Sequence, residues 1–304
     1  MSTLVTGERG FVGSYLAGAW PDVIGLGRVD ITESARLKTR VSELRFERVV
    51  HLAGVSFVPD SFADPARTLA INLGGTLNLL QALDAIGFTG CLLYVGSGAV
   101  YGEVEPEHLP VLEERPLRPP TPYAVSKVAA EALCYQWSRT SPYRIVMARP
   151  FNHTGPGQSE RFFVPGLARQ LVEIQAGRRE CRLELGDLGG SRDFSHVADV
   201  ARAYRALLEN GHNGEAYNVC SGRETRLLEV VRRMQALVGL ALPVTSGQRS
   251  HRPSEQKRMV ASFQKLNAHT GWRPEHDLDS CLRDVLEYWG HSSGMSSASP
   301  LEPS

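Results

Sequence analysis

The sequence predicts an α/β fold in which helices cover both faces of a parallel sheet and a smaller lobe follows toward the C-terminus. Three observations lead to this prediction. A glycine-rich turn follows the first apolar run, short apolar segments alternate with helical segments through the first half, and looser Gly- and Pro-rich segments follow Pro150. With 304 residues, the chain is long enough to bury a full core and to form both units.

The first expected strand, residues 3–6, runs directly into a turn with glycines at three-residue intervals. Gly7 permits a tight turn, Gly10 lets backbone N–H groups approach a pyrophosphate, and Gly13 lets the following helix pack against the strand. The spacing is G-x-x-G-x-x-G and not the commoner G-x-G-x-x-G, so an ordinary glycine-rich loop is the alternative. The pattern favours a Rossmann-like dinucleotide site at the start of the first helix.

Later strands are short, continuous apolar runs such as residues 91–95, which are typical of strands buried on both faces. Ligands of such sheets bind at the carboxyl ends of the strands. Gly7, Gly54, Ser97 and Pro150 are therefore expected at one crevice. The expected strands are residues 3–6, 23–26, 48–53, 91–96 and 144–148, and the expected helices are residues 11–20, 64–86 and 122–139.

Two units and a tail are expected. The second half contains longer Gly- and Pro-rich loops, from which segments 197–209 and 215–219 are expected to return to the first unit. The last residues are Ser-rich and carry no periodicity, which is typical of disorder. The expected division is a dinucleotide-binding domain of residues 1–152 with about 191–221, a substrate-binding lobe of about 153–190 and 222–290, and a disordered tail of residues 291–304.

Composition points to a small-molecule partner. Lys and Arg together number 33, as do Asp and Glu, and no long run of like charge occurs, so neither nucleic acid nor a membrane surface is expected. The 5 cysteines are widely spaced, which favours free, packed thiols over disulfides or a metal site. No segment reaches the roughly 20 apolar residues of a membrane span, and no signal peptide is recognisable, so we expect a cytoplasmic protein.

Tyr123 and Lys127 are four residues apart at the start of a helix that begins near Pro122, so both point to one face of it. A nearby ammonium is expected to lower the pKa of the Tyr123 phenol and tune it for acid–base work. Ser97 closes a buried strand where a substrate carbonyl would meet a hydroxyl donor. The alternatives are a Tyr and a Lys on a solvated helix face and a turn-forming serine.

Four motifs carry a resemblance to a known family. They are T-G-x-x-G-F-V-G from Thr6, H-L-A-G from His51, Ser97 followed by V-Y-G, and Tyr123 with Lys127. Together they resemble the extended short-chain dehydrogenase/reductase family that acts on nucleotide sugars. The resemblance covers nearly the whole chain. It implies that Tyr123 donates a proton, that Lys127 holds the nicotinamide ribose, and that Ser97 hydrogen-bonds the reacting oxygen.

Within this family the chain resembles the branch that reduces the C4 ketone of GDP-4-dehydro-6-deoxy-D-mannose to GDP-D-rhamnose, for polysaccharides such as lipopolysaccharide. Related 4,6-dehydratases carry a carboxylate two residues after the Ser/Thr position, where this chain has Ala99. A methyl group cannot transfer a proton, so reduction is favoured over dehydration. The segments that carry this resemblance are residues 149–158, 191–194, 217–222, 252–255 and 270–274.

The resemblance also implies binding residues. Guanidinium groups suit phosphate oxygens, and a carboxylate suits two vicinal hydroxyls. The implied substrate residues are Ser97, Tyr123, Asn152, Val164, Arg192, Arg252 and Glu255. The implied cofactor residues are Gly7, Gly10, Phe11, Val12, Gly13, Arg28, Asp30, Ile31, Leu52, Ala53, Gly54, Asn72, Val95, Tyr123, Lys127 and Pro150.

The turn after the second strand bears on cofactor choice. Arg28 there would bind a 2′-phosphate, which favours NADP(H). NAD(H) stays possible, because Arg28 can instead lead into the Asp30-Ile31 pair that resembles an adenine contact. No metal is expected. His51 is expected to be a packed histidine, and Asn72 is expected to tie its helix to the site by a hydrogen bond.

Alternatives of three kinds accompany this interpretation. The same reduction on the other sugar face would give GDP-6-deoxy-D-talose, and a C4 epimerase would retain its NAD. A non-catalytic dinucleotide-sensing regulator is disfavoured by the Tyr123 and Lys127 pair. The family's usual four-helix contact predicts a homodimer, through an apolar surface formed by Leu69, Leu73, Leu77 and Leu80 on one helix and Val128, Ala132 and Leu133 on another.

Overall fold

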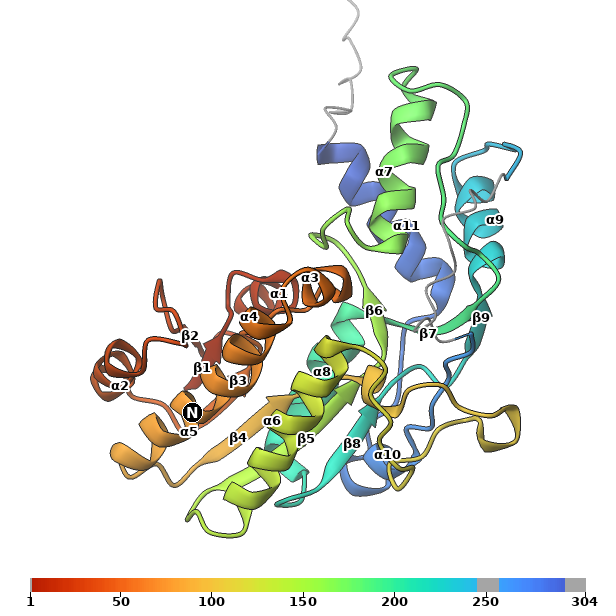
Figure 1. Ribbon diagram of the computed structural model, residues 1–304. Coiled ribbons are helices and arrows are strands. Elements are labelled where there is room, and N and C mark those ends of the chain that lie inside the picture. The colour runs from red at the N-terminus through yellow and green to blue at the C-terminus, as the bar shows by residue number, and fades with distance from the viewer. Residues whose placement is uncertain (1, 245–256, 293–304) are drawn as a thin grey trace, which may run out of the picture.

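The computed structural model describes residues 2–244 and 257–292 (Figure 1). Its main sheet has six parallel strands in the order β2-β1-β3-β4-β5-β8. This confirms the predicted α/β fold. The strands are β1 (Thr3–Thr6), β2 (Val23–Gly25), β3 (Arg48–His51), β4 (Cys91–Val95), β5 (Arg144–Pro150) and β8 (Ala216–Val219).

Helices cover both faces of this sheet. On one face, α1 (Phe11–Ala19) and α8 (Val197–Asn210) pack over residues such as Val5 and Leu93. On the other face lie α2 (Ser34–Glu43), α5 (Gly75–Ala85) and α6 (Pro122–Ser138). Alternation along each fully buried strand sends successive side chains into the two cores, as the apolar runs predicted.

The helix expected over residues 64–86 is divided. It consists of α4 (Pro65–Leu69), the π-helical turn η1 (Ala70–Gly74) and α5. In the first half of the chain, two further helices, α2 and α3 (Val58–Ala63), were not predicted. In α2 only Leu37 and Val41 are buried, so its apolar stripe is too short to stand out in the sequence.

A smaller unit stands beside the main sheet, with its helices gathered on one side of the molecule (Figure 1). Its sheet joins β6 (Asn152–Thr154), β7 (Ser191–His196) and β9 (Glu224–Arg226) in the order β6-β7-β9. Helices α7 (Phe163–Gln175), α9 (Leu227–Leu237) and α11 (Leu278–Ser292) form its core.

The expected domain division differs from these contacts in two places. Strand β7 was expected with the first unit, yet it pairs with β6 and β9. Helix α10 (Gln264–Thr270) was expected in the lobe, yet Leu266 and Trp272 pack in the core between α8 and the main sheet. Residues 291 and 292 belong to α11, and the rest of the expected tail lies outside the described residues.

Other expectations concern the thiols and the membrane. All five cysteines are free, and four of them are buried as predicted, but Cys181 is exposed. Besides the π-helical turn η1, the structure has two short 3-10 helices, η2 (Gly98–Tyr101) and η3 (Pro106–His108). Within residues 2–244 and 257–292, every helix is too short or too polar to cross a bilayer.

His51 is a fully packed histidine, as predicted, and it links β1, β3 and α5. The Thr6 hydroxyl accepts from Ala53 N–H and donates to His51 Nδ1 over 2.7 Å. The Thr76 hydroxyl donates to the Asn72 carbonyl, so it accepts from His51 Nε2 over 3.0 Å. Both ring nitrogens are therefore satisfied in the neutral form, and burial, helped by the Lys127 charge, lowers the pKa of His51 to about 3.

Acidification is expected to destabilise the fold through His51. The unfolded chain protonates this imidazole below about pH 6.5, whereas the folded chain does so only near pH 3, so stability present above pH 6.5 is lost as the pH falls between these values. The loss is about 2 kcal/mol at pH 5. Urea unfolding at pH 7 and pH 5 measures it, with His51→Asn as the comparison. An identical change in the free energy of unfolding for both proteins would contradict the assignment.

Candidate functional site

The register of the main sheet brings the ends of four strands to one edge. Thr6 lies opposite His51, His51 opposite Tyr94, and Val95 opposite Ala148. The segments that follow these strands therefore meet, as predicted from the sequence. A Cβ built on Gly54 would lie 2.7 Å from Asn72 Oδ1 and 3.9 Å from Lys127 Nζ, which places three predicted cofactor residues side by side.

The glycine-rich turn is built as the sequence predicts. Gly7 has a φ of 75°, and a Cβ there would lie 2.8 Å from Ala53 N. A Cβ on Gly13 would lie 2.2 Å from the Gly7 carbonyl oxygen, so α1 can approach β1 only without a side chain at this position. Gly10 is the exposed N-cap residue of α1, and because it has no side chain, no cap covers the first N–H groups of the helix. This end of α1 can thus receive an anion.

The turn after β2 contains a carboxylate that sequence reasoning missed. Glu8 Oε1 accepts from Gly27 N–H over 3.1 Å, and a Cβ on Gly25 would lie 2.7 Å from the Glu8 side chain. Arg9 Nε is 4.0 Å from the same oxygen. Arg28, the residue after Gly27, is exposed. Two guanidinium groups and one carboxylate therefore define the charge of this turn. The position of Glu8 directly after Gly7 was the available signal.

Asp30 and Ile31 form a closed local turn. Asp30 Oδ1 accepts from both the backbone N–H and the hydroxyl of Thr32, which lowers the pKa of Asp30. Ile31 is buried against Gly75, and Asn78 donates to its carbonyl over 2.9 Å. Helix α5 thus fixes the loop in which an adenine contact was predicted.

Helix α6 positions Tyr123 and Lys127. The Thr121 hydroxyl caps the helix by accepting from Ala124 N–H over 3.0 Å, and Pro122 occupies the first turn, where its missing N–H costs nothing. Both side chains lie on the buried face, with 8% exposure each, and Lys127 Nζ is 6.0 Å from the centroid of the Tyr123 ring. The two are brought together as the four-residue spacing predicted.

The expected lowering of the pKa of Tyr123 by Lys127 is wrong. Burial raises the pKa of Tyr123 and outweighs a hydrogen bond with Ser97 that lowers it. Burial also lowers the pKa of Lys127 to about 8, against a smaller opposing effect of Cys134. In this low-dielectric setting burial shifts the pKa of each group toward its neutral form, yet with a pKa of about 8 Lys127 stays mostly charged at pH 7. Helical spacing could not show this effect of tertiary burial.

Ser97 stands at the end of β4, as predicted. Its hydroxyl caps η2 by accepting from Ala99 N–H over 3.2 Å, and the same side chain reaches Tyr123. Ser97 therefore faces the phenol across the strand end. Ala99, at the position where related dehydratases carry an acid, is a half-buried methyl group on the same turn.

Asn72 ties α5 to the site, as predicted, from within the π-helical turn. Its Oδ1 accepts from Val55 N–H over 2.8 Å, and its amide donates to Ser126 Oγ over 2.8 Å. Ser126 in turn donates to the Tyr123 carbonyl over 2.7 Å. A π-helical turn at a functional site is common, and here it aims one amide at both the loop after β3 and the first turn of α6.

A buried ion pair joins α6 to β5. Arg149 donates from Nε to Glu131 Oε2 over 3.0 Å and from Nη2 to Oε1 over 2.6 Å. Its Nη1 donates to Tyr101 Oη and to the Glu113 carbonyl. Tyr101 then donates to Asn218 Oδ1 over 2.7 Å. The network connects the helix that bears Tyr123 with the turn that follows Ser97 and with β8.

The predicted substrate residues of the lobe lie on different elements. Asn152 is exposed at the start of β6, directly after Pro150 and Phe151, whereas Val164 is buried in α7. Arg192 is half-buried on β7 and donates to the Ser191 carbonyl. The predicted residues Arg252 and Glu255 lie outside the described residues.

Asp193 is a buried residue whose role sequence reasoning missed. Its Oδ1 accepts from Ser221 N–H over 2.7 Å, and its Oδ2 accepts from Gly222 N–H over 2.9 Å. Burial raises the pKa of Asp193 to about 6, against these hydrogen bonds. The carboxylate fastens β7 to the end of β8, and the S-R-D-F motif around it was the signal.

A contact between the segment after β3 and the segment before α7 was also unforeseen. Arg161 donates to both carboxylate oxygens of Asp60, over 3.1 and 2.6 Å, and its guanidinium lies 4.0 Å from the Phe57 ring centroid. Phe162 meets Phe57 edge-on at 5.5 Å. On the glycine-loop side, Phe11 stacks on His153 at 6.0 Å. These contacts join the first unit to the segments that lead into the lobe.

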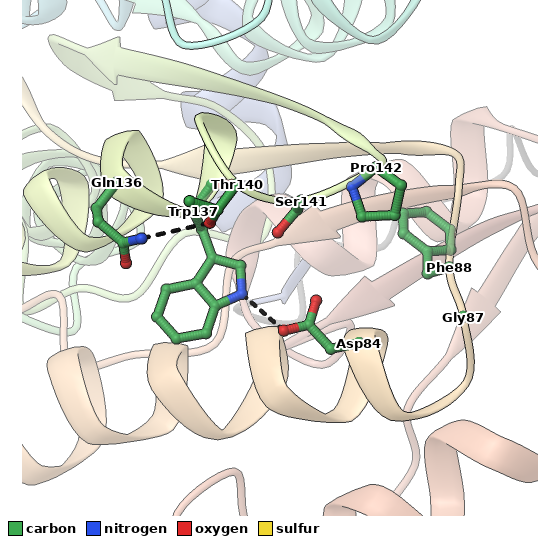
Figure 2. A pocket seen from close by; sticks show the side chains of 8 residues that line it. All are labelled: Asp84, Gly87, Phe88, Gln136, Trp137, Thr140, Ser141 and Pro142. Atoms are coloured by element: carbon green, nitrogen blue, oxygen red, sulfur yellow. Dashed lines mark hydrogen bonds between the residues drawn. The ribbon is translucent and has the colours of Figure 1, made fainter.

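A pocket of about 260 Å³ lies elsewhere, between the C-terminal ends of α5 and α6 (Figure 2). Trp137 Nε1 donates to Asp84, another residue that lines it, over 2.9 Å. The pocket contains none of the predicted site residues. In the described part of the chain, no group of three His, Cys, Asp or Glu side chains gathers as metal ligands would.

Comparison with known proteins adds sequence relatives. Residues 20–285 match the family model described as GDP-mannose 4,6 dehydratase. The chain is 46% identical over 292 residues to GDP-6-deoxy-D-mannose reductase of Pseudomonas aeruginosa, an alignment that covers 94% of this chain and 96% of the relative. It is 31% identical to UDP-glucose 4-epimerase 2 of Oryza sativa subsp. japonica, over 88% of this chain and 69% of that protein.

Solved structures agree with these relatives. The structure of RMD from Pseudomonas aeruginosa complexed with NADPH has a TM-score of 0.91 and 43% identity, covering 96% of this chain and 100% of that chain. A UDP-glucose 4-epimerase complex with NAD from Thermus thermophilus has a TM-score of 0.84 and 30% identity, covering 95% and 99%. The chain therefore belongs to the GDP-mannose 4,6-dehydratase family of the extended short-chain dehydrogenases/reductases.

Proposed function

We propose that this protein reduces the C4 ketone of GDP-4-dehydro-6-deoxy-D-mannose to GDP-D-rhamnose, with NADPH as hydride donor. The observation that carries the proposal is the convergence of Ser97, Tyr123 and Lys127 beside the glycine-rich turn, on a chain 46% identical to a GDP-6-deoxy-D-mannose reductase. The nucleotide sugar would bind between this edge of the sheet and the lobe. The product would serve cell-surface polysaccharide synthesis.

Tyr123 is the proposed proton donor. When bound, NADPH would supply the hydride for the C4 carbon and become NADP⁺, and the carbonyl oxygen would take one proton from Tyr123, so that ketone, hydride and proton balance as an alcohol. Because burial raises the pKa of Tyr123, the phenol carries its proton at neutral pH, as a donor must. The phenolate left behind would be stabilised by the charged form of Lys127, and Ser97 would orient the carbonyl through its hydroxyl.

Ala99 favours reduction over dehydration. Elimination of water from a hexose needs a further acid–base group near the reacting carbons, and the dehydratases that this chain resembles place a carboxylate at this position. The side chain here is a methyl group on the turn that follows Ser97. Tyr123 alone supplies the one proton that reduction requires.

The proposed cofactor site uses the turn after β2 for the adenosine end. Arg28 and Arg9 would meet a 2′-phosphate, and Glu8, which already accepts from Gly27 N–H, would be offset by Arg9 at 4.0 Å. NADPH is the ligand in the structure of RMD from Pseudomonas aeruginosa, which supports this preference. The other residues that the family resemblance implies for the cofactor are proposed to bind it as well.

On the substrate side, Asn152, Val164 and Arg192 are proposed to contact the GDP-sugar, together with Arg252 and Glu255. Arg192 suits the diphosphate because guanidinium groups match phosphate oxygens. The division into a dinucleotide-binding domain and a substrate lobe, and a cytoplasmic location, are further proposals of the same interpretation.

A C4 epimerase that retains NAD is the second candidate. The 31% identity with a rice UDP-glucose 4-epimerase and the NAD-bound structure of the Thermus thermophilus epimerase support it, but more weakly than the reductase relatives support reduction. Both reactions would use Tyr123 and Lys127. They differ in whether the reduced cofactor is consumed.

The reaction is tested by adding GDP-4-dehydro-6-deoxy-D-mannose, made in situ from GDP-mannose by a separate dehydratase, and following NADPH and NADH oxidation. We expect faster oxidation of NADPH and a product whose C4 configuration, read by NMR, is that of rhamnose. A talose configuration would keep the chemistry and change the sugar face. Absence of oxidation with either cofactor, together with sugar interconversion without added cofactor, would support the epimerase instead.

Tyr123→Phe is expected to lower kcat by about two to four orders of magnitude, because the ring remains but its proton does not. Binding of NADPH, measured by fluorescence titration, is expected to change little. Tyr135→Phe is the matched control, since Tyr135 is 53% exposed on the same helix. Turnover of the Tyr123 variant close to that of this control would remove Tyr123 as the donor.

We also propose a homodimer formed through α4, α5 and α6. Of the predicted apolar surface, Leu69 and Ala132 are exposed and Leu73, Leu77, Val128 and Leu133 are half-buried, but Leu80 is fully buried in the core and does not contribute. Phe62 and Val125, exposed by 45% and 43% on the adjoining α3 and α6, extend the surface. A second copy would cover an apolar area that a monomer rarely leaves in water.

Sedimentation equilibrium at micromolar concentration is expected to give the mass of two chains. Leu69→Glu places a charge in the proposed contact and is expected to shift the mass toward one chain. Leu112→Glu is the control, because Leu112 is 50% exposed outside these helices. One chain mass for the unsubstituted protein would refute the dimer.

A further inference from the structure

Lys127 is a buried cation without a carboxylate partner among the described residues. Glu131, one turn further along α6, is occupied by both Nε and Nη2 of Arg149. A buried ammonium is costly unless other groups replace its hydration. The question is therefore which neutral groups hold this one in place.

Two groups from β4 contact the ammonium of Lys127. Lys127 Nζ donates to the Val95 carbonyl oxygen over 2.9 Å. The same nitrogen lies over the Tyr94 ring, 5.5 Å from its centroid, within the range of cation–π attraction. The Tyr94 hydroxyl donates to the backbone carbonyl of Lys127 over 3.2 Å, so this residue contacts the lysine at both ends.

The Tyr94 ring is itself held firmly. Alternation along β4 sends this side chain toward α6, and it is 1% exposed. Its ring lies 6.2 Å from the ring of His51, the residue opposite it in β3, and both His51 nitrogens are already bonded. The ring face beneath Lys127 is thus fixed by the sheet before any ligand binds.

We propose that Tyr94 is a positioning residue, whose ring face holds the Lys127 ammonium in its charged form beside Tyr123. The inference rests on the proposed function for the use that Lys127 makes of its charge. The attraction itself rests on geometry alone. Because Tyr94 is 1% exposed, we expect it to touch neither the cofactor nor the sugar and to act through Lys127.

The other titratable groups near Lys127 are neutral or directed elsewhere. His51 on β3 stays neutral because burial lowers its pKa to about 3. On α6, burial raises the pKa of the Cys134 thiol, and Glu131 pairs with Arg149. Tyr123 stays protonated because burial raises its pKa. The Tyr94 ring therefore supplies an attraction that no neighbouring carboxylate replaces.

The test is the titration of Lys127 by NMR in the full chain labelled with [ε-¹³C]lysine. The sequence has only four lysines, Lys38, Lys127, Lys257 and Lys265, so Lys127→Arg assigns the signal. Position 94 is varied as tyrosine, as Tyr94→Phe, and as 3,4,5-trifluorophenylalanine, which keeps the shape of the ring and removes most of the negative charge from its face.

We expect the pKa of Lys127 in the unsubstituted protein near the value of about 8 that burial imposes. Tyr94→Phe keeps the ring face and is expected to change it by less than about 0.3. The trifluorinated ring is expected to lower it by about half a unit to one unit. The same fluorinated residue at Tyr143, buried in the same core, is the control and is expected to leave Lys127 unchanged.

Equal pKa values of Lys127 for all three rings at position 94, or an equal shift from the substitution at Tyr143, would overturn the proposal. Thermal unfolding of each variant verifies that it is folded. Because the titration needs neither cofactor nor sugar, its outcome is separate from the reductase assay. If the pKa of Lys127 depends on the ring but no reductase activity is found, the role of Tyr94 stands and the proposed function is rejected. If reductase activity is found but the pKa does not depend on the ring, the function stands and the role of Tyr94 is rejected.

Discussion

The buried ion pair between Glu131 and Arg149 is the interaction on which the arrangement of the site depends. It clamps α6 to β5 with two hydrogen bonds, and both side chains are only 8% exposed. Removing one partner would leave an uncompensated charge inside the protein, at a cost of about 3–5 kcal/mol. The same guanidinium fixes Tyr101, and through it the turn that follows Ser97. Helix, strand and turn therefore keep one geometry relative to one another.

Burial gives this site its chemical character. Tyr123, Lys127 and His51 are all removed from water, and desolvation is the largest influence on the pKa of each. A neutral phenol, a lysine whose pKa is lowered to about 8 and a neutral imidazole follow from the same cause. Hydrogen bonds from Ser97 and attraction from aromatic rings then adjust groups whose state burial has set. Such a setting strengthens any charge that develops on a bound oxygen.

The sequence was sufficient for features that depend on local pattern. Apolar runs located the five strands of the first half, and the spacing of Gly7 and Gly13 matched the close approach of α1 to β1. The four-residue interval predicted the shared face of Tyr123 and Lys127 correctly. The strand and helix predictions depend on side-chain periods of two and of about 3.6 residues, and the glycine prediction depends on close approach of backbone without a side chain.

Features that depend on tertiary contacts were beyond such patterns. The direction of the pKa shift of Tyr123 reflects burial by several elements. The π-helical turn around Asn72 has no signal in the amino-acid composition of its helix. The position of Glu8 against Gly27 joins two turns far apart in the chain. Strand β7 carries an alternation that fits either sheet, so its partners follow from folding and not from its own residues.

The path of the chain between the two sheets limits how the molecule can open. It passes from β5 into β6, returns through β7 into α8, leaves β8 for β9, and returns again to α10 before α11. Asp193 fastens one of these passages to another. Because the chain crosses between the two units several times, a swing of one unit against the other must bend every crossing at once, which restrains it more than a single linker would.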